Sequence, residues 1–294
     1  MQLDPNHLAA LSAVLRLGSF DAAAQALFVT PSAISQRIKA LEEQVGAALV
    51  QRGQPCTGTD MGLRMAKHAE DLGLLEAALL QDIGMARADP PPRLRVAVNA
   101  DSLATWFVSA MARADGVLFD LVVDDQDHSA DWLKRGEVSA AVTALTAPVR
   151  GCDMHVLGAL EYRATASPAF VAQWFPDGVT AEAIARAPCL TYNAKDQLQR
   201  RWIRSQLGPC PEPPQHFLPS TTAFVEAAEL GVGWGLNPAH LVAQAVAEGR
   251  LVELLPDAGF RTPLSWQVSR LLGAALAPVT RAVVKSGRRN LIQT

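Results

Sequence analysis

The chain has 294 residues, of which 49 % are hydrophobic and 19 % are charged. This length is too great for a lone small helical motif and suits about two domains. The net charge of −3 argues against a protein held on nucleic acid by bulk charge alone, so any binding to nucleic acid must rely on a few placed contacts.

Three helices are predicted at the amino end, over residues 5–17, 21–27 and 32–45. Gly18 ends the first helix, because glycine readily turns the chain out of a helix. Pro31 stands where proline is favoured, in the first turn of the third helix. The second and third helices are joined by a tight corner at residues 28–30 and together predict a helix-turn-helix.

The third helix has one apolar face and one polar face. The apolar face carries Ile34, Ile38, Leu41 and Val45, and the other face carries Ser32, Ser35, Gln36, Lys39 and Glu43. Steps of four and three residues are typical of a helix buried on one side. Short polar and basic side chains on the other side can enter the major groove of DNA. This helix therefore predicts a DNA-binding protein.

A short irregular stretch after Gly46 runs through Arg52 and Pro55 to Gly58. It is the right place for a wing, a small hairpin beside the recognition helix. Arg52 could reach a phosphate from there. A solvated loop arginine is an equally good interpretation of the residue on its own.

Residues 59–85 are predicted to form a long helix that Thr59 caps. Its stripe has a four-three rhythm and consists of Met61, Met65, His68, Leu72, Leu75, Leu79 and Asp82 or Ile83. This rhythm is typical of a helix that pairs with another helix. We favour a dimerisation helix, because roughly 25 residues at about 1.5 Å each are longer than a small domain needs. Packing within its own domain is the alternative.

Residues 87–92, RADPPP, predict a hinge, because successive prolines stop a helix and favour an extended linker. Beyond it, strands alternate with helices. The predicted strands lie near residues 94–98, 118–123, 140–144, 160–166, 189–192, 216–219, 232–236 and 264–269. The predicted helices lie near residues 101–113, 129–135, 222–230 and 278–289, with others starting at residues 168 and 180. Such alternation predicts mostly parallel sheets, here in two lobes, with lobe I over about 93–165 and 265–294 and lobe II over about 166–264.

Nothing in the chain points to an enzyme, a metal or a cofactor. Cys56, Cys152, Cys189 and Cys210 lack metal-ligand spacing, and reduced thiols are expected. There is no nucleophile elbow, and the six histidines show no triad spacing. Gly231-x-Gly233-x-Gly235 follows a predicted helix rather than a strand, which disfavours a dinucleotide loop. With no charged-then-apolar leader and no apolar run near the roughly 18 residues that span a bilayer, we expect a cytoplasmic protein.

The arrangement resembles that of the LysR-type transcriptional regulators, over the whole chain. The most specific segments are Ala22–Leu27, Thr30–Ile38 and Leu41-Glu42, whereas Gly58–Gly62 matches the family only in part. The resemblance implies a winged helix-turn-helix (1–58), a linker helix (59–86), a hinge (87–92) and a two-lobed α/β effector domain like a periplasmic binding protein (93–294). It implies base contacts from Ser32, Ser35 and Gln36, and backbone contacts from Thr30, Arg37, Lys39 and Arg52. Pro31 replaces the glutamine that many members carry, which removes one base contact.

A narrower resemblance links Ala97–Trp106, Arg135–Val138 and Leu157–Leu160 to the ArgP/LysG/IciA branch of that family. It implies a regulator that senses lysine or arginine and activates a basic amino-acid exporter gene. The implied partners are promoter DNA, the effector and further copies of the chain as a homodimer or homotetramer, with RNA polymerase left open. Another effector, or an architectural DNA binder without one, remains the alternative.

Ligands of two-lobed α/β domains bind at strand ends and helix N-termini. The effector-site candidates are Asn99, Asp101, Ser102, Trp106, Asp124, Asp125, Thr221 and Thr222. A helix N-terminus suits an α-carboxylate, aspartates would neutralise a cationic side chain, and Trp106 would flank its methylene stem. Asp101 or Ser102 could instead be a plain cap, the aspartate pair a solvated strand end, and Trp106 a core residue.

Overall fold

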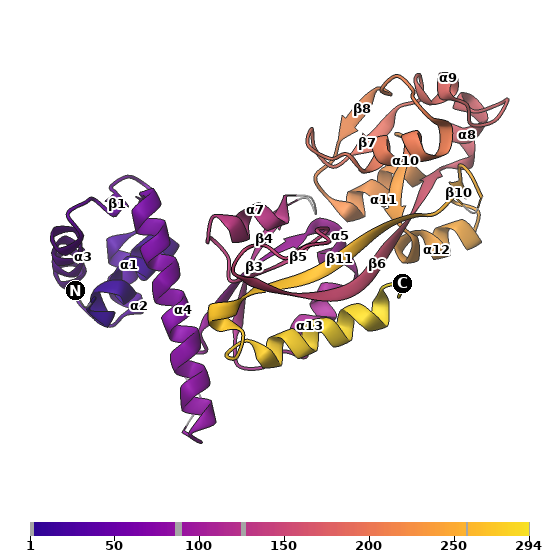
Figure 1. Cartoon of the computed structure of the whole chain (residues 1–294). Coiled ribbons are helices and arrows are strands. Elements are labelled where there is room, and N and C mark those ends of the chain that lie inside the picture. Colours follow the sequence, from indigo (N-terminus) through magenta and orange to yellow (C-terminus); the bar gives the residue numbers. More distant parts are fainter. Residues whose placement is uncertain (1–2, 86–89, 125–127, 257, 294) are drawn as a thin grey trace.

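The computed structural model describes residues 3–85, 90–124, 128–256 and 258–293. A small helical domain at the amino end leads into the long helix α4 and then into a larger two-lobed α/β domain, as Figure 1 shows. This is the domain order expected from the sequence. No helix in the described ranges is long and apolar enough to cross a membrane.

The amino-terminal domain packs three helices and a hairpin around one core. The elements are α1 (Pro5–Leu17), α2 (Phe20–Ala26), α3 (Pro31–Val45), β1 (Val50–Gln51) and β2 (Thr57–Gly58). Each helix starts at a side chain that accepts a hydrogen bond from its first turn, and these caps are Asp4, Ser19 and Thr30. Leu11, Ile34 and Leu49 are fully buried in the shared core.

The hairpin β1–β2 is the expected wing, and α3 holds it in place. The strands pair antiparallel, with Val50 opposite Gly58. The Glu42 carboxylate accepts hydrogen bonds from the backbone N–H groups of Leu49 (2.8 Å) and Val50 (3.2 Å). The end of the recognition helix is therefore tied directly to the first wing strand.

Helix α4 (Asp60–Asp82) joins the two domains. Of the expected stripe, Met65 and Leu72 pack against the amino-terminal core and Leu75 packs against the larger core. Met61 and Leu79 keep 46 % and 59 % of their surface exposed. Only part of the stripe therefore packs within this chain, and pairing with a second copy stays a prediction. Residues 87–89 of the expected hinge lie outside the described residues.

The larger domain is built on a mixed sheet. Its strands are β3 (Arg93–Asn99), β4 (Leu118–Asp124), β5 (Ala140–Thr143), β6 (Cys152–Ala166), β9 (Gly235–Pro238), β10 (Val252–Glu253) and β11 (Phe260–Ser269). The order is β10-β6-β11-β5-β3-β4, with β9 also paired to β6. A separate pair consists of β7 (Cys189–Thr191) and β8 (Gln215–Phe217).

The expectation of mostly parallel sheets is wrong. Strand β3 pairs parallel with β4 and β5, and β7 pairs parallel with β8. The pairs that involve β6 or β11 are antiparallel. The reason is that β6 is 15 residues long, far longer than expected, and β11 returns beside it along most of its length. These two strands run from one lobe into the other (Figure 1).

Helices cover the sheet in both lobes. Lobe I carries a continuous helix with a central π turn, made of α5 (Ala100–Ser102), η1 (Leu103–Phe107) and α6 (Val108–Met111), together with α7 (Ser129–Lys134), η2 (Arg270–Leu272) and α13 (Ala277–Asn290). Lobe II carries α8 (Pro168–Trp174), α9 (Ala181–Ile184), α10 (Leu198–Leu207), α11 (Thr221–Glu229) and α12 (Ala239–Ala247). Helices α10 and α12 were not anticipated from the sequence.

Candidate functional site

The recognition helix α3 presents the polar face that its sequence predicts. Ile34, Ile38 and Leu41 are fully buried. Ser32, Gln36 and Lys39 are exposed, whereas Ser35 and Arg37 are half-buried. Thr30 caps the helix by accepting a hydrogen bond from the backbone N–H of Ala33 (3.2 Å). The polar side is therefore open to a duplex, with the helix N-terminus uncovered.

Arg52 follows β1 in the wing and is exposed. Its guanidinium carbon lies 5.4 Å from the centre of the Phe20 ring. Such a cation–π contact leaves the N–H donors available while restraining the side chain. Arg52 thus adds a positioned positive charge beside α3, as a phosphate contact requires, although its role there stays a prediction.

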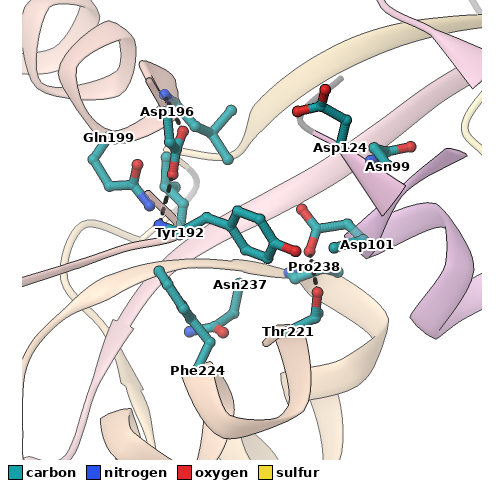
Figure 2. A pocket seen from close by; sticks show the side chains of 13 residues that line it. Asn99, Asp101, Asp124, Tyr192, Asp196, Gln199, Thr221, Phe224, Asn237 and Pro238 are labelled. Atoms are coloured by element: carbon teal, nitrogen blue, oxygen red, sulfur yellow. Dashed lines mark hydrogen bonds between the residues drawn. The ribbon is translucent and has the colours of Figure 1, made fainter. Parts of the chain in front are cut away.

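A cavity lies where the ends of strands from both lobes meet, as Figure 2 shows. It is lined by Asn99, Ala100, Asp101, Asp124, Tyr192, Asp196, Leu198, Gln199, Thr221, Phe224, Leu236, Asn237 and Pro238. The space inside it, mouth included, is about 460 Å³. This volume lies within the range that is typical of small-molecule binding sites.

Asp101 is the central residue of the cavity. One carboxylate oxygen accepts a hydrogen bond from Thr221 Oγ1 (2.8 Å) and the other accepts one from the Tyr162 hydroxyl (2.8 Å). Burial raises the pKa of the Asp101 carboxyl above its ordinary value of 3.8, and nearby Asp196 raises it further, against the two hydrogen bonds. Because Asp101 lies on lobe I and Thr221 on lobe II, this carboxylate also joins the lobes.

Two other carboxylates line the cavity and are held by hydrogen bonds. Asp196 is 8 % exposed and accepts from the backbone N–H groups of Tyr192 (3.1 Å) and Leu198 (2.8 Å). Asp124 accepts a hydrogen bond from Trp132 Nε1 (2.9 Å) at the end of β4. In Figure 2 the Tyr192 ring lies across the cavity, with its hydroxyl directed toward Asp101.

Three buried amide side chains at the cavity have an oxygen atom with no hydrogen-bond partner within the described ranges. These atoms are Asn99 Oδ1, Asn237 Oδ1 and Gln199 Oε1. Their residues are at most 4 % exposed, and a buried acceptor without a partner is costly. Together with the carboxylates they make a cavity rich in hydrogen-bond acceptors. Such a cavity suits a cation with several N–H donors.

Some predicted effector residues lie elsewhere. Trp106 is 1 % exposed and packs edge-on against Phe107 in the lobe I core, with ring centroids 5.6 Å apart. Ser102 is fully buried, Thr222 is exposed on α11, and neither is among the residues that line the cavity. These three residues therefore do not line the cavity in this structure, and their contact with an effector stays a prediction. Asp125 lies outside the described residues.

The sequence interpretation missed the residues that lobe II contributes after β7 and at the end of β9. Tyr192 and Asp196 follow β7, and Asn237 lies in β9. The rule that was applied to the first two strands, that ligands bind at strand ends, identifies these positions too. The Asn193-to-Asp196 turn, where Asn193 Oδ1 accepts from the Lys195 N–H (2.8 Å), was a further local signal.

Comparison with known proteins follows the same division of the chain. Residues 5–63 match the family model "Bacterial regulatory helix-turn-helix protein, lysR family", and residues 87–290 match "LysR substrate binding domain". The HTH-type transcriptional regulator LysG of Mycobacterium tuberculosis is 44 % identical over 282 residues, which cover 96 % of this chain and 93 % of that protein. ArgP of Pseudomonas aeruginosa is 40 % identical over 290 residues, which cover 97 % and 96 %.

Solved structures show the same fold. The crystal structure of ArgP from Mycobacterium tuberculosis superposes with a TM-score of 0.81 at 42 % identity and covers 100 % of both chains. Full-length LysG from Corynebacterium glutamicum, solved with bound effector Arg, superposes with a TM-score of 0.67 at 35 % identity and covers 98 % of this chain and 99 % of that one.

Proposed function

This chain belongs to the LysR family of bacterial transcriptional regulators, and we propose that arginine or lysine is its effector. The observation that supports the proposal most is the cavity between the lobes, where the buried carboxylate Asp101 lies among acceptor groups. Its relatives are regulators rather than enzymes, so the cavity is a sensing site.

The chemistry of the cavity favours a cationic amino acid. A guanidinium carries five N–H donors and an ammonium carries three, and neither has an acceptor. Asp101, Asp124 and Asp196 offer negative charge, and the amide oxygens of Asn99 and Gln199 offer neutral acceptors. Helix α11 is nine residues long and starts at the cavity. Its N-terminus suits an α-carboxylate, because the first N–H groups of a helix have no partner inside the helix. The arginine bound in the Corynebacterium relative supports this assignment.

Calorimetric titration with arginine, lysine, citrulline and glutamate tests the effector. Citrulline has the shape of arginine without its charge, so we expect it to bind roughly tenfold or more weakly, the usual value of a charged hydrogen bond. Asp124→Asn should weaken arginine more than citrulline, whereas the exposed, distant Asp177→Asn should weaken neither. Equal losses for both ligands would exclude charge pairing at Asp124.

We further propose that the regulated gene encodes an exporter of basic amino acids, because the chain resembles LysG and ArgP along its whole length. Footprinting on the DNA upstream of candidate exporter genes, with and without arginine, tests this. We expect a protected site that changes on addition of arginine. A protected site that no ligand alters would instead favour an architectural role, and a site that responds only to another metabolite would favour a different effector.

A further inference from the structure

Phe28 has an unusual backbone conformation at the turn of the helix-turn-helix. It is the one residue other than glycine with a positive φ in the described ranges, and that φ is 54°. Left-handed backbone is disfavoured for residues with a Cβ, above all for bulky ones. Residues that are kept in such a strained conformation are frequent at functional sites.

The turn itself explains the conformation but not the choice of phenylalanine. The N–H of Phe28 donates to the Gln25 carbonyl (3.2 Å) and the N–H of Val29 donates to the Ala24 carbonyl (3.0 Å). These bonds form the Schellman motif, in which the residue after the helix takes a left-handed conformation and is usually glycine. The same position is Gly18 after α1 and Gly46 after α3.

The Phe28 side chain does not serve the core. It is 96 % exposed, more than any other large apolar side chain in the described part of the chain. Val29, its neighbour, packs against the amino-terminal core and so supplies the apolar contact that accompanies such a turn. A large ring is therefore held in solvent at a position where glycine would suit the backbone better.

We propose that Phe28 contacts DNA, packing its ring against a thymine methyl group at the edge of the groove that α3 enters. Phe28 lies two residues before the cap Thr30 and four before Ser32, within about 14 Å of chain. The first residues of a recognition helix are those that meet base edges. The proposal rests on the DNA-binding function of α3.

The ligand chemistry follows from the groove. Apart from the C5-methyl of thymine, the base edges in the major groove present polar donors and acceptors, and phenylalanine is one of the side chains that contact this methyl. Phosphates are charged and hydrated, so a hydrocarbon ring gains little from them. The ring therefore adds base preference beside the polar contacts expected from Ser32 and Gln36.

The variants Phe28→Asn and Phe28→Gly test the proposal, because both residues accept a left-handed backbone. The parent protein first selects a duplex from a randomised pool, and all affinities are measured on that duplex by fluorescence anisotropy. We expect each variant to raise the melting temperature by roughly 2–4 °C and to weaken DNA binding severalfold. Leu230→Asn, which removes an apolar side chain that is 74 % exposed on lobe II, should leave the affinity unchanged.

Deoxyuridine in place of thymine isolates the methyl group. One such substitution per half-site should weaken the parent by about fourfold for each half-site, the value of one buried carbon. It should leave the affinity of Phe28→Asn unchanged, because the ring that contacts the methyl is gone. Deoxyuridine elsewhere in the site should affect parent and variant alike.

The proposal would be overturned by a Phe28→Asn protein that binds as tightly as the parent, or by a loss of affinity that is equal on every deoxyuridine-scanned duplex. A change in oligomeric state on sedimentation of Phe28→Asn would also overturn it, by making a second copy the partner of the ring. A parent that selects no duplex at all would instead contradict DNA binding by α3.

Discussion

We expect Asp101 to couple effector binding to protonation. Burial raises the pKa of its carboxyl above 3.8 in the free protein, and a cationic ligand binds the ionised form. Effector affinity should therefore rise with pH through the range between the ordinary and the raised pKa, and binding should release up to one proton. Titration of arginine in buffers with different ionisation enthalpies measures that proton directly.

Asp101→Asn should remove the proton release and weaken arginine by roughly 1.5–3 kcal/mol, the value of hydrogen bonds to a charged group. The stability of the free protein should depend on pH in the opposite direction to effector affinity. A carboxyl whose folded-state pKa is raised makes folding less favourable as pH rises from 3.8 toward the raised value. The free Asp101→Asn protein should thus melt no lower than the parent at neutral pH. Unchanged proton release would remove Asp101 from the site.

Gln36 belongs to the polar face of α3 and is exposed. Gln36→Ala should weaken binding to the selected duplex by roughly 1–3 kcal/mol and relax the preference at one base position. Gln206→Ala, an exposed glutamine of α10 in lobe II, is the matched control. If selection with Gln36→Ala returns the parental sequence profile, Gln36 does not read bases.

A single site residue can be predicted when the sequence close to it determines where its side chain lies. The face of α3 follows from the spacing of Ile34 and Ile38 alone. Trp106 lies in the π turn of residues 103–107, whose geometry the sequence spacing does not indicate, and its side chain packs in the core of lobe I. Tyr192 and Asn237 lie at strand ends, but the packing of lobe II decides which strand ends face the cavity, and the sequence does not show that packing.

Among the elements, α4 offers a matched pair of glycines. A Cβ added at Gly62 would lie 1.9 Å from the Leu49 carbonyl oxygen, whereas at Gly73 it meets nothing nearer than Pro92 at 3.9 Å. Gly62→Ala should destabilise the amino-terminal domain by about 1–3 kcal/mol, because backbone must move. Gly73→Ala should stabilise it by roughly 0.5–1 kcal/mol, because alanine favours the helix.

Thermal unfolding followed by far-UV circular dichroism compares these two variants. Both replace a glycine of the same helix with the same residue, so the difference isolates the contact with Leu49. No destabilisation by Gly62→Ala would contradict the close approach of α4 to Leu49, and destabilisation by Gly73→Ala would contradict the open surroundings of that glycine.

Elements with strong local signals were predictable and elements that depend on the sheet were not. Helices α1, α3 and α4 follow from apolar periodicity and caps such as Thr59. Strand β6 was expected to start near residue 160 but starts at Cys152, because its first half is defined by pairing with β11. Helix α10 carries Arg200, Arg201 and Arg204 around few apolar residues, so its buried side, with Trp202, was overlooked.

In the whole molecule, α4 and lobe I share a buried polar contact, here called the seam and made of Lys67, Asp71 and Ser139. Lys67 is 8 % exposed, and its Nζ donates to Ser139 Oγ (2.8 Å) and pairs with Asp71. Ser139 Oγ in turn donates to the Asp71 carboxylate (3.1 Å). The seam thus connects the helix that carries the DNA-binding domain to the lobe that senses the effector.

Lys67→Met should destabilise the protein by roughly 1–3 kcal/mol, because it leaves the Asp71 carboxylate, which is 18 % exposed, without its charged partner. Lys67→Met with Asp71→Leu should recover most of that loss, since apolar replacement of a whole buried pair is often neutral. Urea unfolding followed by tryptophan fluorescence reports on the larger domain, which holds all six tryptophans. Equal destabilisation in the single and double variants would mean that the loss of stability does not come from leaving Asp71 without Lys67.

The order of domains and the existence of two lobes were predictable, because hinge prolines and changes of periodicity are visible along the chain. The seam was not, because nothing near Lys67 indicates that it meets Ser139, which lies 72 residues further along the chain, just before β5. A buried lysine on an otherwise ordinary helix is recognisable only once β5 is placed beside α4.

Strand β3 has one end at the seam and the other at the cavity. The backbone N–H of Ser139 donates to the Arg95 carbonyl (3.0 Å), and Asn99, four residues further along, lines the cavity, a distance of about 13 Å. Binding free energies at two coupled sites are reciprocal. Any promoter that favours one placement of α4 against lobe I should therefore change the affinity for the effector by the same factor by which the effector changes the affinity for that promoter. The DNA sequence at each site would then set the effector concentration to which the bound protein responds.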